Sequence, residues 1–219
     1  PGAWHVMGVT QGAGLSLRWL RDTSFLPEKE KARELGRDPY DLMTDLAKES
    51  PVGANRLLYL PYLMGERTPH LDPDCRGVFF GLSAMHTRGD LARAVLEGIS
   101  YSLKDCLDIL DGMGARPESM LLTGGGARSP FWRQMLSDVF GCPATTIQAS
   151  EGPALGVAIL AGVGAGLYSS VEAACDRMIQ TGERLTPDMK AHQAYAACHG
   201  LYTRLYPALK DSFKQLKQL

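Results

Sequence analysis

Cysteine patterns that would indicate a disulfide framework or a zinc site are missing from the sequence. The five cysteines, Cys75, Cys106, Cys142, Cys175 and Cys198, stand far apart, form no Cys-x-x-Cys pair and are odd in number. The histidines also lack the spacing of metal ligands, so no metal-binding residue is assigned. This cysteine usage is typical of a reducing compartment, and we expect a cytoplasmic protein.

An excess of charge of one sign and long apolar runs are missing as well. The 219 residues carry a formal net charge of -1 at pH 7. Nucleic acids and anionic membranes select basic surfaces, so we expect neither as a partner. No apolar run approaches the roughly 20 residues of a membrane helix, and the first residues do not resemble a signal peptide. The chain does not begin with methionine, and we expect it to be a piece of a longer polypeptide.

What is present is the composition of an ordinary globular domain, with 45% apolar and 21% charged residues. Short apolar segments predict strands at residues 4–9, 57–60, 120–123 and 144–148. Helices are predicted at residues 15–21, 131–140, 154–165 and 189–219. Two further helices are predicted within residues 27–48, separated by a break at Asp38. A capping box at residues 87–90 predicts the start of a long helix. This alternation predicts an α/β fold whose ligands bind at glycine-rich turns that follow strands.

The most informative turn follows the apolar segment at residues 120–123. It contains Gly124, Gly125 and Gly126, and Ser129 then precedes a helix. Consecutive glycines allow a ligand to approach the backbone, and a helix start offers unpaired N–H groups. The turn could therefore be a nucleotide-binding turn. A plain strand-to-helix turn explains the pattern equally well, because neither the Walker consensus nor the dinucleotide fingerprint is matched.

Two other segments have open alternatives. Residues 150–156 lead into a helix of small residues, which favours tight core packing over ligand binding. The loop at 65–76 is rich in charge and includes Glu66, Arg67, Asp72, Asp74 and Arg76. Its side chains could hold magnesium or phosphate, but ion pairs and turn caps within the loop are slightly favoured.

Three stretches together resemble a known family. Residues 77–82, a gap of seven residues, and residues 90–97 match the second signature of the FGGY carbohydrate kinases. Residues 61–70 and 124–136 resemble the xylulokinase branch, and glycerol kinases differ in both stretches. The resemblance covers nearly the whole chain and is weakest between residues 25 and 55. It implies an actin-like (ribonuclease H-like) ATPase fold, the C-terminal FGGY domain, over residues 1–219, with helices from about 169–219 packed on it.

The resemblance also implies a nucleotide site. ATP would lie against Gly14 and Arg18 on one side and against Gly124, Gly125, Gly126 and Ser129 on the other. Residues 153–156 would line the far side of this turn, and Arg67 would face the cleft. The implied reaction is phosphorylation of D-xylulose to D-xylulose 5-phosphate with ATP and Mg²⁺.

No catalytic residue is assigned, because the catalytic Asp of the family precedes the residues present here. We therefore expect the isolated chain to be inactive. Two alternatives stay open: an FGGY kinase for another ketose or polyol such as ribulose, and a non-catalytic, actin-like nucleotide-binding module. The domain is expected to lack its first strands and not to form a complete five-stranded sheet. The strand at residues 4–9 would then lie at an exposed edge or pair with a second copy in a homodimer.

Overall fold

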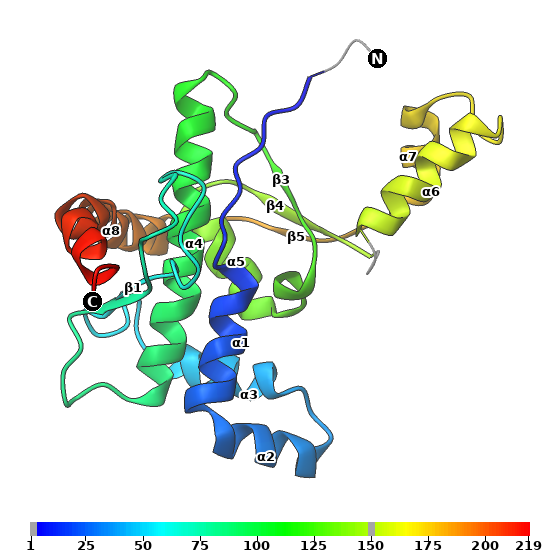
Figure 1. The fold of residues 1–219 in the computed structure, drawn as a ribbon. Helices are drawn as coiled ribbons and strands as arrows, with labels where there is room; N and C mark the ends of the chain where they lie inside the picture. Colours follow the sequence, from blue (N-terminus) through cyan, green and yellow to red (C-terminus); the bar gives the residue numbers. More distant parts are fainter. Residues whose placement is uncertain (1–3, 149–151) are drawn as a thin grey trace.

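The computed structural model describes residues 4–148 and 152–219, which form helices around two small sheets (Figure 1). In the 2-stranded sheet, β1 (Leu58–Leu60) pairs antiparallel with β2 (Val78–Phe80). In the 3-stranded sheet, β3 (Met120–Leu122) is parallel to β4 (Ala144–Ile147), and β4 is antiparallel to β5 (Thr181–Leu185). Among the described residues no five-stranded sheet forms, in agreement with the expectation from the sequence.

The helices agree closely with the sequence prediction. They are α1 (Ala13–Ser24), α2 (Leu26–Leu35), α3 (Pro39–Glu49), α4 (Arg88–Gly112), α5 (Pro130–Phe140), α6 (Gly152–Gly164), α7 (Val171–Met178) and α8 (Met189–Leu216). Within the described ranges, no helix combines the length with the apolar character that a membrane crossing requires.

Helix α4 is the centre of the molecule, and α1, α3, α5, α8 and β1 all pack against it (Figure 1). The predicted capping box at its start is confirmed: Thr87 Oγ1 accepts from Asp90 N, and Asp90 Oδ2 accepts from Thr87 N at 2.8 Å. On the buried face of α4, a Cβ on Gly98 would overlap with the carbonyl oxygen of Tyr59. Glycine at this position therefore lets β1 lie directly on the helix.

The predicted strand at residues 4–9 is wrong. These residues have no regular secondary structure, and Trp4 is fully exposed. One reciprocal contact fixes the end of the segment: Thr68 N donates to Val9 O at 3.0 Å, and Val9 N donates to Thr68 Oγ1 at 3.2 Å. A strand requires a ladder of backbone partners. A β-prone sequence without such a ladder remains an extended segment.

Helices α6 and α7 pack mainly on each other and stand apart from the rest of the molecule (Figure 1). They connect β4 to β5, and Gln148 N donates to Gln180 O at 2.9 Å where the two strands meet the connection. Strand β5 was not predicted, because its sequence is polar and all but Leu185 of its residues are exposed. Helix α8, in contrast, packs against α4, α5 and β1.

Candidate functional site

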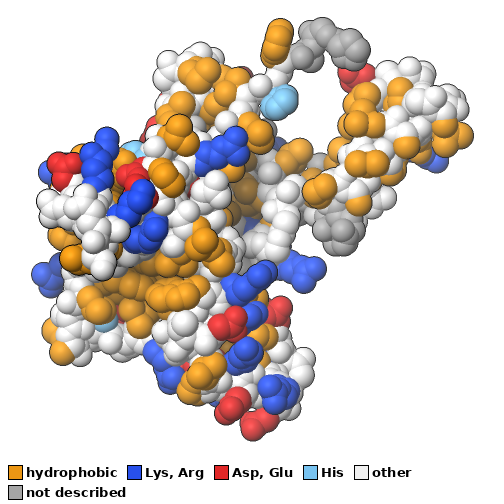
Figure 2. All heavy atoms as spheres, viewed as in Figure 1, with side chains coloured by type: hydrophobic (Ala, Val, Ile, Leu, Met, Phe, Trp, Pro, Cys, Tyr) orange, Lys and Arg blue, Asp and Glu red, His pale blue; other side chains and the backbone are white. Residues whose placement is uncertain are grey.

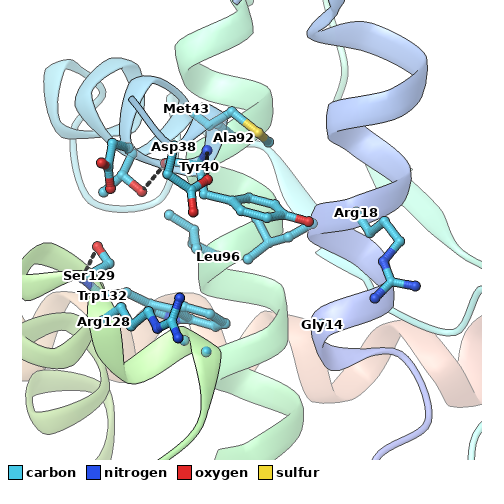
Figure 3. A pocket seen from close by; sticks show the side chains of 15 residues that line it. Gly14, Arg18, Asp38, Tyr40, Met43, Ala92, Leu96, Arg128, Ser129 and Trp132 are labelled. Atoms are coloured by element: carbon cyan, nitrogen blue, oxygen red, sulfur yellow. Dashed lines mark hydrogen bonds between the residues drawn. The ribbon is translucent and has the colours of Figure 1, made fainter. Parts of the chain in front are cut away.

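A cavity of about 490 Å³ lies between α1, α3, α4 and the turn before α5 (Figure 3). Its size is in the usual range for small-molecule sites. The lining residues are Gly14, Leu17, Arg18, Asp38, Tyr40, Asp41, Met43, Thr44, Ala92, Leu96, Gly125, Gly126, Arg128, Ser129 and Trp132. Segments far apart in the sequence thus meet around one concave space.

The glycines around the cavity have different physical roles. Gly124 has a φ of +84°, which favours glycine, and it sets the direction of the turn. A Cβ on Gly126 would lie 2.5 Å from the Trp132 ring, so this glycine allows the turn to pack on the ring. A Cβ on Gly14 or Gly125 would meet no atom of the described residues within 4 Å. Side chains at these two positions would extend into open space beside the cavity without displacing the protein.

The start of α5 holds the turn at residues 124–129 in a fixed position. Ser129 Oγ accepts from Trp132 N at 3.3 Å as the helix cap, and Pro130 occupies the first helical position. Trp132 Nε1 donates to Ser100 Oγ on α4 at 3.0 Å, which fixes the indole ring. A helix start that borders a cavity favours anionic or hydrogen-bond-accepting ligand groups.

The cavity combines apolar and charged walls. Leu17, Met43, Ala92 and Leu96 supply apolar surface. Two basic side chains border it: Arg18 from α1, and Arg128 from the turn before α5 on the other side of the space (Figure 3). An arginine guanidinium is well suited to phosphate groups. Apolar surface, accessible glycine backbone and arginines together fit a ligand that has a planar apolar part and an anionic part, as a nucleotide does.

The sequence-predicted residues fall into two groups. Gly14, Arg18, Gly125, Gly126 and Ser129 all line this one cavity. Gly124 is not a lining residue but shapes the turn. Arg67 is exposed and does not line the cavity. Residues 153–156 do not line it either, because they belong to α6. Ser150 and Glu151, predicted with them, lie outside the described residues.

In the loop at residues 65–76, the acidic side chains form contacts within the protein. Glu66 Oε1 accepts from Gln11 N at 2.8 Å and from Arg67 N at 2.7 Å. Asp72 accepts from Asp74 N and from the Tyr206 hydroxyl, both at 2.9 Å. Burial raises the pKa of Glu66, and hydrogen bonds from the backbone oppose this rise. The structure thus favours contacts within the loop and with Gln11 and Tyr206 over a magnesium or phosphate site for these carboxylates.

Asp105, Asp108 and His199 form a group that sequence spacing did not reveal, because His199 comes from α8 and the two aspartates from α4. His199 Nε2 lies 2.7 Å from Asp105 Oδ1, and Asp108 pairs with Lys104. Asp105 and His199 thus link α4 to α8, whereas Asp108 pairs with Lys104 within α4, so all three side chains have partners in the protein.

Helix α3 is the part of the site that sequence reasoning missed. Asp38, Tyr40, Asp41, Met43 and Thr44 form one wall of the cavity. The sequence indicated a break at Asp38 and a helix after it, but it did not place this helix beside the cavity. Periodicity shows that a helix has an apolar face, but it does not show which neighbours that face meets.

Comparisons with known proteins agree with this architecture. The sequence profile described as the FGGY family of carbohydrate kinases, C-terminal domain, matches residues 1–165. The xylulose kinase of Staphylococcus epidermidis is 41% identical over 219 residues, which are 100% of this chain and 41% of that protein. The gluconokinase of Bacillus licheniformis is 36% identical over 217 residues, covering 97% of this chain and 42% of that protein.

The solved structure of xylulose kinase from Lactobacillus acidophilus superposes with a TM-score of 0.82 at 30% identity, covering 94% of this chain and 40% of that one. This similarity confirms the predicted actin-like ATPase fold. The chain spans about two fifths of the length of the relatives that it matches. On the matched profile, which covers well over half of its residues, the chain belongs to the FGGY family of carbohydrate kinases.

Proposed function

We propose that this chain is the ATP-binding part of a sugar kinase whose full-length form phosphorylates D-xylulose. The observation that carries the proposal is the cavity in which Gly14 and Arg18 face the turn of Gly125 and Ser129. The Staphylococcus epidermidis and Lactobacillus acidophilus relatives, both named xylulose kinases, support the choice of sugar.

In the proposed reaction, ATP supplies the γ-phosphoryl group and Mg²⁺ offsets its charge. The apolar wall of the cavity excludes water from the nucleobase, and the open backbone at Gly125 lets the nucleotide approach closely. Arg18 and Arg128 offer positive charge to the polar part of the nucleotide. The base that activates the sugar hydroxyl is proposed to belong to the part of the relatives that this chain does not span.

Calorimetric titration of the chain with ATP at millimolar concentration tests nucleotide binding. Gly125→Val should weaken binding at least tenfold, because the new side chain occupies the ligand space without a clash that would unfold the turn. Gly200→Val is the matched control: Gly200 also has open space around its Cβ position but lies on α8, away from the cavity. Equal affinities of the wild-type chain and Gly125→Val would contradict the proposed site.

The substrate and the inactivity of the isolated chain require a second measurement. ADP release with D-xylulose should be negligible for this chain and should appear for the full-length protein. A gluconokinase among the relatives gives a specific reason to test other acceptors. Gluconate and ribulose should therefore be compared with xylulose by kcat/KM. A full-length protein that binds ATP but phosphorylates no sugar would instead support a non-catalytic nucleotide-binding module.

A further inference from the structure

Tyr40 is held rigidly in the wall that α3 contributes to the cavity. Asp38 Oδ1 caps α3 by accepting from Tyr40 N at 2.9 Å, and Pro39 fixes the backbone between them. Tyr40 O accepts from Thr44 Oγ1 at 2.7 Å. The first turn of α3 is therefore locked by side-chain hydrogen bonds at both of its ends.

The Tyr40 side chain is fixed as well. Arg21 Nη1 donates to Tyr40 Oη at 3.1 Å, and the Arg21 guanidinium carbon lies 5.1 Å from the ring centroid. Arg21 in turn pairs with Asp22 at 2.7 Å. Arg21 does not line the cavity whereas Tyr40 does, so Arg21 supports the ring from outside. An aromatic ring held in this way loses little conformational entropy when a ligand stacks on it.

Across the cavity from Tyr40 lie Arg128 and Trp132 (Figure 3). Gly126 packs on the Trp132 ring, and Gly125 beside it has open space. The two walls thus border a space with an aromatic ring on one side and glycine backbone on the other. Planar groups such as nucleobases bind well in such a space, because every base has a face that stacks on an aromatic ring.

Asp38 adds a polar group to the same wall, and Figure 3 shows its carboxylate directed toward the cavity. Oδ1 accepts from the helix backbone, while Oδ2 has no hydrogen-bond partner among the described residues. An ionised carboxylate accepts hydrogen bonds only. It therefore favours a ligand edge with an amino group and repels an edge with a carbonyl oxygen.

We propose that Tyr40 stacks on the purine base of the nucleotide and that Asp38 accepts a hydrogen bond from its exocyclic amino group, which selects adenine over hypoxanthine. The inference rests on the nucleotide-binding function proposed above and names the residues that determine the specificity of that site. Neither residue belongs to the glycine turns predicted from the sequence.

Titration of the chain with ATP and with ITP, whose base carries a carbonyl in place of the amino group, tests the inference. Tyr40→Ala should weaken binding of both nucleotides about tenfold, from the loss of stacking. Tyr40→Leu keeps apolar bulk in the wall and should show a similar loss. Tyr40→Phe, which keeps the ring, should stay within about threefold of wild type. Thermal unfolding of each variant checks that the chain remains folded.

Asp38→Asn is the specificity variant, because asparagine also caps helices but its amide can donate to a carbonyl. It should lower the preference for ATP over ITP about tenfold. Wild-type affinity for both nucleotides in Tyr40→Leu would overturn the stacking role, and an unchanged preference in Asp38→Asn would overturn the selection of the amino group. A wild-type chain that binds neither nucleotide would overturn the proposed function itself, which distinguishes the two failures.

Discussion

Glu97 is a buried carboxylate whose protonation is linked to folding. It is 1% exposed, and its Oε1 accepts from Arg93 Nε at 2.6 Å and from Gly53 N at 3.0 Å. Its Oε2 is buried without a partner among the described residues. Burial raises the pKa of Glu97 to about 7, although the charge of Arg93 favours the ionised form. An acid with a raised pKa in the folded state stabilises the fold at low pH.

The free energy of unfolding should therefore contain a contribution from Glu97 that decreases as pH rises. The unfolded-state pKa is near the ordinary value of 4.5, so between pH 4.5 and about 7 the folded chain binds more protons than the unfolded chain. The slope is at most about 1.4 kcal/mol per pH unit. Urea unfolding at pH 5, 6, 7 and 8 should show this decrease in the wild-type chain relative to Glu97→Gln. Parallel profiles would disprove the linkage, and Glu49→Gln at an exposed position serves as control.

Among the residues that line the cavity, the glycines were predicted from the sequence, whereas the residues of α3 were not. Gly125 and Gly126 belong to a turn motif that can be recognised in a linear sequence, whereas Gly14, in the first turn of α1, was implied by the family resemblance. Tyr40 could not be predicted, because its role depends on Arg21 and on the position of α3 against the turn. The family resemblance gave no help, because it is weakest between residues 25 and 55.

The turn between α3 and β1 is an element with an unusual backbone. Ala54, Asn55 and Arg56 have φ values of 45°, 55° and 73°, which non-glycine residues rarely adopt. Asn55 Nδ2 donates to Asp90 Oδ1 at 2.7 Å, and His86 Nε2 lies 3.2 Å from Asn55 O. Contacts with the start of α4 thus hold the chain in a left-handed conformation, which costs about 1–2 kcal/mol per residue.

Replacement of Arg56 by glycine should therefore stabilise the protein. Its side chain is exposed, so the substitution should remove backbone strain without loss of packing. We expect an increase of about 0.5–1 kcal/mol in the free energy of unfolding, after allowance for the greater flexibility of glycine in the unfolded chain. Arg56→Ala, which keeps a Cβ, should show no such gain. Denaturant unfolding distinguishes the two variants, and equal stabilities would argue against strain at this position.

Among the elements, helices were predicted well and strands poorly. Local signals, such as Asp38 before Pro39 or Thr87 before Asp90, define where α3 and α4 begin. A strand depends on its partner: residues 4–9 have β-prone side chains but no ladder, whereas polar β5 forms because β4 lies beside it. Pairing between distant segments is not encoded in any one of them.

The α6–α7 unit, residues 152–178, carries apolar side chains at its surface, where Figure 2 shows hydrophobic atoms. Val157 and Leu160 of α6 are 68% and 63% exposed, and Leu167 is 77% exposed. Exposed apolar surface of this kind promotes association between molecules.

Leu160→Glu combined with Val157→Glu should therefore reduce concentration-dependent self-association, measured by sedimentation velocity. The stability of the chain should change by less than about 0.5 kcal/mol, because both side chains are exposed. Ile159→Glu is a control for burial. Ile159 lies next to Leu160 but is buried, so a charge there should destabilise the α6–α7 unit. A wild-type chain that stays monomeric at every concentration would contradict the expectation.

The hydrogen bond between Gln148 and Gln180 has a consequence for how the chain can be shortened by deletion. It holds the entry to and the exit from the α6–α7 unit at one point, and the antiparallel strands β4 and β5 continue from there. A two-residue turn is sufficient to join antiparallel strands. The unit is thus a detachable insertion in a β-hairpin. Removal of residues 149–179 and closure with Asn-Gly should leave the cavity between α1, α3, α4 and the turn before α5 intact, so that a shortened protein retains the site.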